Sequence, residues 1–225
     1  MINKIVQTMA DAMAGVKDGM TVLLGGFGLV GQPNNLVDAL IELGAKDLTI
    51  VANNAGGGTT GLTALMEHGR VRRLVCSFPR SNSTIFEELY RAGKIELEIV
   101  PQGTMAERIR AAGAGVGAFF TPTGVGTKMA EGKEVRDING RMMVLEHALR
   151  GDIALVEAWE ADRWGNLTFK LSGRNFNPVM ATAADITIVQ SQHIVELGAI
   201  DPQNVMCPGI FVDRVIHIPY GDPPF

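Results

Sequence analysis

The sequence predicts an α/β protein in which a mostly parallel β-sheet is flanked by helices, with residues 1–225 forming a single domain. Two observations predict this class. Short runs of β-forming residues alternate with amphipathic segments along the chain, as right-handed crossovers between parallel strands require. The first run, Thr21–Leu24, passes directly into a glycine-rich loop whose backbone N–H groups a ligand can approach closely.

The elements follow in order along the chain. Strands are expected at Thr21–Leu24, Leu48–Ala52, Arg73–Ser77, Glu96–Val100, Ile153–Ala158 and Ile186–Val189. Helical patterns lie between several of them, at Ile5–Val16, Asn34–Leu43, Thr63–His68, Thr84–Ala92 and Met105–Ala112. The segment from about 113 to 151 is a glycine-rich excursion within the domain, expected to be irregular apart from a hairpin around Asp137–Arg141. The tail, Pro219–Phe225, is expected to be a surface strand end or loose.

Composition limits the function classes. With 46% hydrophobic and 20% charged residues, the chain can bury a sizeable core. A net charge of −4 without a basic stripe argues against nucleic acid as a partner. No apolar run reaches the roughly 18 residues that a membrane span needs, so no membrane association is expected. The N-terminus lacks the apolar region of a signal peptide, which favours the cytoplasm.

Residues able to hold a metal or attack a substrate are scarce. Cys76 and Cys207 lie far apart and are expected to be buried free thiols, as is usual in a reducing compartment. The histidines are dispersed without a ligand spacing: His68, His147, His193 and His217. We therefore expect no metal site and no nucleophile of a familiar motif in this chain.

Polar side chains follow two of the predicted strands. Asn53 and Asn54 come directly after the strand at Leu48–Ala52, and Gln102 follows the strand at Glu96–Val100. Neutral amides can orient a carboxylate or a carbonyl without reacting with it. Each could instead have a structural role, with Asn53 and Asn54 satisfying a turn and Gln102 capping the helix that begins near Met105. Their equivalent positions at strand ends favour a ligand site.

The glycine loop permits a second interpretation. Gly26-Phe-Gly28-Leu-Val-Gly31 satisfies the G-x-G-x-x-G fingerprint of dinucleotide-binding proteins. That fingerprint requires an acidic residue after the second strand, about 20 residues further on, and Asn53 and Asn54 stand there instead. Pro33, two residues after the last glycine, also argues against a crossover helix that starts at the loop. A dinucleotide-binding module is therefore the weaker alternative.

A longer pattern agrees better with the whole chain. Asp18–Pro33 resembles the signature of the A (alpha) subunit of family I coenzyme A transferases. Further blocks are similar to that family: Val51–Gly56, Ile99–Thr104, Ala106–Arg110, Phe120–Thr127, Asp162–Thr168 and Arg174–Pro178. The resemblance covers essentially the whole chain and implies the open α/β fold of coenzyme A transferases.

The resemblance implies a ping-pong reaction in which a glutamate attacks an acyl-CoA thioester. In this family that glutamate belongs to the B (beta) subunit, in a Ser-Glu-Asn-Gly motif that this sequence lacks. Four of the chain's glutamates, considered for this role, stand in other contexts: Glu131, Glu146, Glu157 and Glu160. The resemblance therefore implies no catalytic residue here and activity only with an obligate B subunit, in an A2B2 heterotetramer or its dimeric core. Coenzyme A would be a co-substrate, with no permanently bound cofactor.

The resemblance also assigns the substrate-binding residues. Asn53, Asn54 and Gln102 would hold the carboxylate of the acid substrate near the partner's glutamate. The glycine loop would line the same cleft and supply backbone donors through Gly25, Gly26, Phe27, Gly28 and Gly31. The loop Thr121–Thr127 would be an edge of this cleft or an interface element.

The substrate is expected to be a 3-oxo acid. Cys76–Arg80 and Glu87–Gly93 are most similar to the 3-oxoadipate and succinyl-CoA:3-oxoacid branches. The resemblance therefore favours 3-oxoadipate with succinyl-CoA as donor, and the alternative is the alpha subunit of an acetate or acetoacetate transferase. Arg80 follows a predicted strand, and we expect it to contact the distal carboxylate of 3-oxoadipate.

Overall fold

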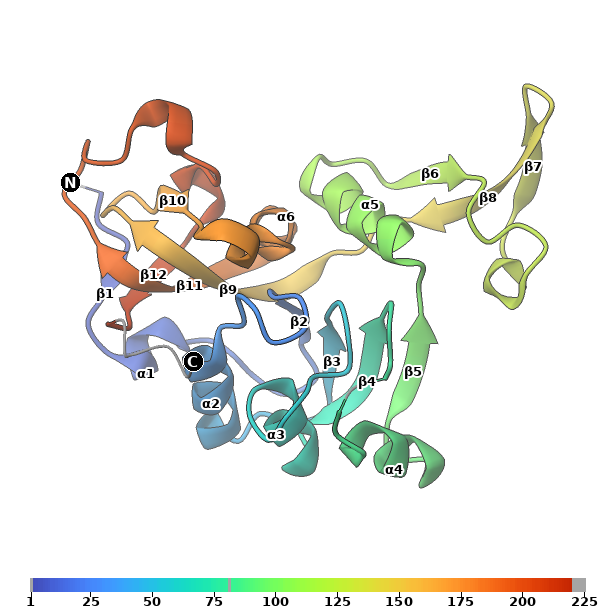
Figure 1. The fold of residues 1–225 in the computed structure, drawn as a ribbon, viewed down its shortest axis with the longest axis horizontal. Coiled ribbons are helices and arrows are strands. Elements are labelled where there is room, and N and C mark those ends of the chain that lie inside the picture. Colours follow the sequence, from blue (N-terminus) through green and yellow to red (C-terminus); the bar gives the residue numbers. More distant parts are fainter. Residues whose placement is uncertain (1, 81, 220–225) are drawn as a thin grey trace.

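The structure, a computed structural model, describes residues 2–80 and 82–219, so most of the predicted loose tail lies outside the described residues. A nine-stranded sheet with the order β1-β12-β11-β9-β2-β3-β4-β5 forms its centre, and β10 pairs with β9 beside this path (Figure 1). The β9–β10 pair is antiparallel and the other pairs of this sheet are parallel. The predicted mostly parallel sheet is confirmed.

The strands and helices have the following bounds. The strands of the large sheet are β1 (Ile5–Val6), β2 (Thr21–Leu24), β3 (Leu48–Val51), β4 (Val71–Cys76), β5 (Glu96–Ile99), β9 (Gly151–Ala161), β10 (Leu167–Thr168), β11 (Ala184–Ile194) and β12 (Arg214–His217). The helices are α1 (Met9–Ala12), α2 (Asn34–Leu43), α3 (Leu62–Glu67), α4 (Ile85–Arg91), α5 (Gln102–Gly113) and α6 (Asn177–Ala181). A second, small sheet contains β6 (Ala118–Thr121), β7 (Val135–Ile138) and β8 (Arg141–His147).

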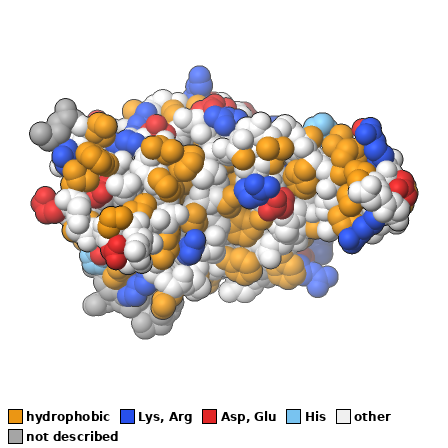
Figure 2. Space-filling view, turned by 90° about the horizontal axis from the view of Figure 1, so that it is seen from above, with side chains coloured by type: hydrophobic (Ala, Val, Ile, Leu, Met, Phe, Trp, Pro, Cys, Tyr) orange, Lys and Arg blue, Asp and Glu red, His pale blue; other side chains and the backbone are white. Residues whose placement is uncertain are grey.

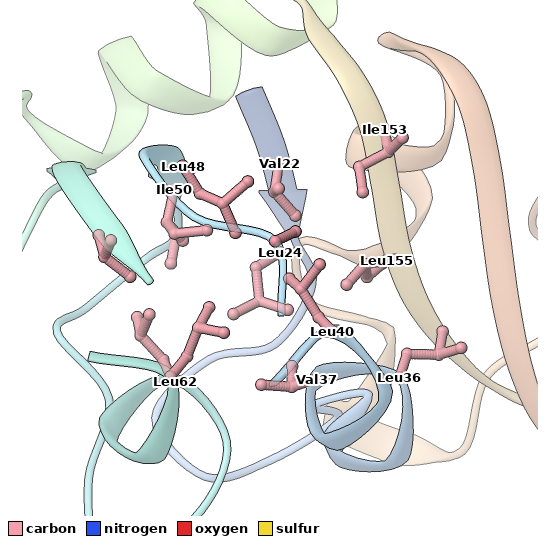
Figure 3. Close-up of a cluster of buried hydrophobic side chains, with 14 of the residues drawn as sticks. Val22, Leu24, Leu36, Val37, Leu40, Leu48, Ile50, Leu62, Ile153 and Leu155 are labelled. Carbon is pink, nitrogen blue, oxygen red and sulfur yellow. The ribbon is translucent and has the colours of Figure 1, made fainter. Parts of the chain in front are cut away.

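The central strands β2, β3 and β9 are buried on both faces of the sheet, which explains their mainly apolar sequences. Successive residues of β2 point to opposite faces, so Val22 and Leu24 join one hydrophobic cluster and Leu23 joins the other. Figure 3 shows the first cluster, where Leu40 of α2 lies beside Leu24 and Leu155 of β9. Helices α1 to α4 cover this face, and α5 and α6 cover the other. The glycine loop that follows β2 therefore starts from a rigid base.

Helix α2 has the bounds that its sequence pattern predicts. Its apolar residues recur at helical spacing, and Leu36, Val37 and Leu40 are fully or almost fully buried. The helix ends at Gly44, whose φ of 80° is left-handed and costs glycine little. Pro33, which is awkward for a helix beginning at the glycine loop itself, stands just before α2 as its N-terminal flanking residue.

Two sequence-based expectations for helices need correction. The sequence pattern predicts a helix that includes residues 5–6, but these residues form β1, whose partner strand β12 lies at the opposite end of the sequence. No local pattern can reveal such a pairing. Gln102 does not cap a helix beginning near Met105, because it is the first residue of α5 itself and Pro101 precedes it.

The segment from about 113 to 151, expected to be irregular, contains the small antiparallel sheet with the order β6-β8-β7. The hairpin predicted around Asp137–Arg141 is confirmed, because β7 and β8 pair with Ile138 opposite Arg141. We call residues 114–150 the arm, since they project beyond the edge of the large sheet at β5 (Figure 1). Hydrophobic and basic side chains lie together at this end of the molecule (Figure 2).

A chain of charges joins the arm to the large sheet. Glu98 of β5 accepts hydrogen bonds from Arg73 of β4 at 2.5 Å and from Arg108 of α5 at 2.8 Å. Arg108 also lies 3.9 Å from Glu146 of β8, a buried carboxylate that Lys133 contacts at 2.6 Å. Burial by itself raises the pKa of Glu98, but the hydrogen bonds and charges of Arg108 and Arg73 outweigh it and hold this pKa below its ordinary value.

Within residues 2–80 and 82–219, no helix is both long and apolar enough to cross a membrane. The described residues also contain no group of three or more His, Cys, Asp or Glu side chains that could hold a metal ion.

Candidate active site

A cleft of about 610 Å³ opens at the carboxyl ends of the parallel strands, where an α/β sheet usually binds its ligand. Three segments that follow neighbouring strands contribute to it: the glycine loop after β2, residues 53–57 after β3, and residues 77–80 together with Asn82 after β4. The first residue of α5, directly after β5, completes it. The lining residues are Phe27, Gly28, Leu29, Asn53, Asn54, Gly56, Gly57, Ser77, Phe78, Arg80, Asn82 and Gln102.

Asn53 is a buried amide of the cleft lining whose oxygen is held by two neighbouring side chains. It is 4% exposed, and its Oδ1 accepts a hydrogen bond from Gln102 Nε2 at 2.7 Å. The hydroxyl of Ser77 lies 3.1 Å from the same oxygen and 2.8 Å from the carbonyl oxygen of Asn53. No described residue accepts a hydrogen bond from Asn53 Nδ2. The contacts at Oδ1 therefore fix the amide with an uncommitted N–H₂ group at the cleft.

Asn54 and Asn82 shape the wall beside Asn53. Asn54 Nδ2 donates to the carbonyl of Gly56 at 3.0 Å, and Asn82 Oδ1 accepts from the N–H of Gly58 at 2.8 Å. The backbone of Asn54 also forms a parallel bridge with Phe78. These contacts hold two adjacent loops together over the ends of β3 and β4.

The glycine loop folds back on itself in a tight turn. The N–H of Phe27 donates to the carbonyl of Val30 at 3.0 Å, and the reverse bond measures 3.1 Å. Gln32 Nε2 donates to the carbonyl of Gly28. The N–H groups of Gly28 and Leu29, both in the cleft lining, have no acceptor among the described residues. Backbone donors are thus available at the cleft.

The structure brings together most of the residues that the sequence predicts for the site. Asn53, Asn54, Gln102, Phe27, Gly28 and Arg80 line one cleft. Gly25, Gly26 and Gly31 are absent from its lining and instead shape the loop behind it. At Gly26, with φ of 114°, and at Gly31, with φ of 68°, the backbone adopts conformations that other residues rarely take.

Sequence reasoning missed several lining residues, including Ser77, Phe78 and Asn82. Ser77 and Phe78 follow β4, which lies between β3 and β5 in the sheet. The rule that singled out Asn53 and Gln102 at strand ends applies to them equally. Asn82 carries no comparable signal, because it enters the cleft from a loop.

Among the described residues, Arg80 is the only ionisable side chain in the lining, which contains no acid and no histidine. The nearby thiol of Cys76, at the end of β4, is fully buried, and burial raises its pKa to about 12 although a backbone hydrogen bond from Phe78 opposes the shift. A thiol that stays protonated is a poor nucleophile. The cleft therefore offers neutral donors and one cation, but no described group that would attack a thioester.

The acidic residues noted in the sequence lie outside this cleft. Glu146 belongs to the charge network of the arm, and Glu160 accepts a hydrogen bond from Thr168 at 2.8 Å. Glu157 of β9 accepts one from Gln192 at 2.6 Å, and burial nevertheless raises the pKa of Glu157. Glu131 ends a short turn of the arm. The residues of the loop Thr121–Thr127 are likewise absent from the cleft lining.

Amide donors, backbone N–H groups without an acceptor among the described residues and one arginine at the strand ends of an α/β sheet are a chemical arrangement that suits a small anionic or carbonyl-containing ligand. The family model "Coenzyme A transferase" matches residues 6–217, so the chain belongs to the coenzyme A transferase family. Family membership makes it a coenzyme A transferase and displaces the dinucleotide-binding interpretation.

Relatives and solved structures agree with this family. The chain is 58% identical to the A subunit of the 3-oxoadipate CoA-transferase of Pseudomonas putida, over 97% of this chain and 95% of that protein. It is 50% identical to succinyl-CoA:3-ketoacid coenzyme A transferase 2B of Mus musculus, over 92% of this chain but only 43% of that protein. Glutaconate coenzyme A-transferase from Acidaminococcus fermentans shares the fold, with a TM-score of 0.84 at 24% identity over 98% of this chain and 77% of that chain.

Proposed function

We propose that the chain is the A subunit of an enzyme that transfers coenzyme A from succinyl-CoA to a 3-oxo acid, with 3-oxoadipate as the preferred acceptor. The observation that carries this proposal is the cleft lining, whose described residues combine neutral donors with a single arginine and include no carboxylate. The names of the Pseudomonas and mouse relatives support the substrate class.

The proposed reaction needs a carboxylate nucleophile from a partner subunit. That carboxylate attacks the thioester carbonyl of succinyl-CoA and releases CoA thiolate, which leaves an acyl anhydride. The thiolate then attacks the carbonyl of the enzyme's own carboxyl, which forms an enzyme thioester and frees succinate. The 3-oxo acid repeats these steps in reverse and leaves as its CoA ester. Coenzyme A is a co-substrate throughout, and no resident cofactor is required.

In this proposal the cleft stabilises the negative charge that forms on the attacked carbonyl oxygen. Asn53 Nδ2 and the N–H groups of Gly28 and Leu29 are donors without a partner among the described residues. Gln102 orients Asn53 and opens α5 at the cleft, so the positive end of that helix also favours an anion. Asn54 positions the neighbouring backbone. Donors fixed before the reaction do not have to reorganise during it.

Arg80 is proposed to recognise the distal carboxylate of 3-oxoadipate. We expect Arg80→Ala to lower kcat/KM for 3-oxoadipate by at least about tenfold, because a hydrogen bond to a charged group contributes about 1.5–3 kcal/mol. Acetoacetate lacks that carboxylate, so its kcat/KM is expected to change less than about twofold. Steady-state kinetics with both acids test this.

Arg91→Ala is the matched control, since Arg91 is an exposed arginine of α4 paired with Glu87. Equal losses for both acids in Arg80→Ala, or no loss for either, would contradict the assignment. Wild-type turnover of acetoacetate but not of 3-oxoadipate would instead favour the alpha subunit of an acetoacetate transferase.

The nucleophile is proposed to come from a B subunit, in an A2B2 heterotetramer. The mouse relative supports this, because this chain matches only 43% of that longer protein. We expect that this chain alone does not transfer coenzyme A from succinyl-CoA to 3-oxoadipate. We expect full activity after co-expression with the B subunit. Light scattering of the active complex tests the assembly. Activity of the isolated chain would show that the nucleophile lies here, and the proposed division of roles would be wrong.

The cytoplasm is the proposed compartment. Both cysteines are free and buried, as is usual for proteins in a reducing environment.

A further inference from the structure

Asn177, the first residue of α6, is fully buried and lies behind the glycine loop rather than in the cleft. Its Nδ2 donates to the carbonyl of Gly31 at 2.9 Å and to that of Gly173 at 2.8 Å. Its Oδ1 accepts from the N–H of Glu157 at 3.1 Å. One side chain thus connects the end of the glycine loop, the segment before α6 and the central strand β9.

The same side chain occupies the space beside Gly25 and is one of three groups that crowd Gly31, together with Gly173 O and Asn175 Nδ2. A Cβ atom at Gly25 would lie 1.8 Å from Asn177 Oδ1, far inside contact distance. A Cβ atom at Gly31 would lie 3.0 Å from Asn177 Nδ2. Gly25 has no left-handed φ, so its lack of a side chain is explained by this close approach and not by backbone strain.

We propose that Asn177 is a positioning residue for the transferase reaction, acting through the glycine loop. It fixes Gly31 at one end of the loop and fits against Gly25 at the other. Between these two points lie Gly28 and Leu29, two residues of the cleft lining whose N–H groups have no acceptor among the described residues. Asn175 adds a bond from its Nδ2 to the carbonyl of Val30 at 3.0 Å, so the turn is held from the same segment.

The chemistry of a buried amide suits this task. Asparagine donates to two carbonyls and accepts from one N–H at the same time, which a carboxylate, an alcohol or an apolar side chain cannot do. Because the amide is neutral, it adds no charge behind a loop that must meet anionic substrates. Misplacing catalytic groups by about 1 Å can cost about 10²-fold in rate, so a device that fixes the loop has a large effect without touching substrate.

The test uses the A–B complex and rests on the proposed function that the loop donates to the reacting carbonyl. Asn177→Asp keeps an acceptor for Glu157 N–H and loses the donor to Gly31 and Gly173. We expect kcat at neutral pH to fall at least about tenfold while KM for succinyl-CoA changes less than about threefold, because only transition-state contacts are lost. The loss should shrink as the pH falls, because protonating the introduced carboxyl restores a donor, and burial raises its pKa.

Asn166→Ala is the matched control for stability. Asn166 also holds a loop with its amide, donating to Asp162 Oδ2 at 2.8 Å and accepting from Gly209 N–H at 3.0 Å, but it lies outside the cleft lining. We expect this variant to lower the unfolding midpoint and leave kcat unchanged. If Asn177→Asp lowers only the midpoint, or lowers kcat equally at every pH, the positioning role is wrong. An inactive wild-type complex would instead overturn the proposed function.

A double-mutant cycle keeps the proposal testable if the aspartate variant folds poorly. Gly25→Ala alone should lower kcat, because the new methyl group collides with Asn177 Oδ1. In the Asn177→Gly background that collision is removed, and the next contact of the methyl group is Leu155 O at 3.3 Å. We therefore expect the losses in kcat to be less than additive. Additive losses would show that the two positions act independently and would overturn the proposal.

Discussion

Replacing Asn53 by aspartate is expected to lower kcat/KM of the A–B complex by about 10²–10³, the usual cost of removing one donor to a developing oxyanion. The substitution keeps an oxygen where Gln102 Nε2 and the Ser77 hydroxyl make their contacts, so the loops over β3 and β4 keep their shape. It removes the uncommitted N–H₂ group and brings a negative charge toward the substrate carboxylate. Steady-state kinetics with succinyl-CoA and a 3-oxo acid measure the effect.

Asn204→Asp is the control for this experiment, because it adds the same charge at an exposed position outside the cleft. Thermal unfolding of both variants shows whether the fold is retained. A kcat/KM for Asn53→Asp within about threefold of the wild type would mean that this amide does not donate to the transition state.

Replacing Arg108 by methionine is expected to destabilise the protein by about 3 kcal/mol, at the lower end of the cost of removing one partner from a buried ion pair. The Arg108 side chain is 12% exposed, and it contacts Glu98 at 28% and Glu146 at 4% exposure. Methionine preserves the aliphatic stem but leaves Glu146 with only Lys133 among its described ion-pair partners. Urea unfolding at pH 7 measures this change.

The dependence of the free energy of unfolding on pH in the acidic range is a second measurement that tests the role of Arg108. The folded-state pKa of Glu98 lies below its ordinary value of 4.5, so this carboxylate stabilises the fold above that pH. The contribution disappears as the pH falls through the lowered pKa. In Arg108→Met the loss of stability with falling pH should be smaller, because the variant lacks the residue that contributes most to lowering the pKa of Glu98.

Arg110→Met, on the same helix, is the control for the charge network, since its pair with Glu107 is 61% and 50% exposed and is expected to contribute less than about 1 kcal/mol. If the two arginine variants unfold alike, the network does not stabilise the connection between the arm and the sheet.

The sequence predicts the parts of the fold that local patterns control. The strand at Thr21–Leu24 and the helix at Asn34–Leu43 have the predicted bounds. The strand is mostly buried and the helix is amphipathic, and both properties can be recognised in the local sequence. The helix predicted at Ile5–Val16 is wrong at both ends, since α1 covers only Met9–Ala12. At its start Ile5 pairs with Val215, and only the fold brings these two residues together. The strand β6 and its pairing with β8 escape prediction because they lie in a glycine-rich segment whose pattern is typical of a loop.

In the candidate site, too, local sequence patterns predict some features and tertiary contacts determine the others. Asn53 and Gln102 are predicted from their places after the ends of strands, and the structure adds that one orients the other. The likeness of 174–178 to a family block includes Asn177, but nothing in that stretch says that its amide fills the space beside Gly25. Such a contact depends on how α6 lies against β2 and β9, which is a property of the tertiary structure.

The strand order has a consequence for how this chain emerges from a ribosome. β2 to β5 can pair as soon as they are made, but Val22 of β2 must also pair with Ile153 of β9, which follows the entire arm. Until then β2 presents an unpaired, apolar edge, which is the kind of surface that aggregates. The sheet is completed only when β12 pairs with β1, joining Ile5 to Val215. Long loops must close before these contacts form, so nascent and refolding chains should need protection during a slow final step.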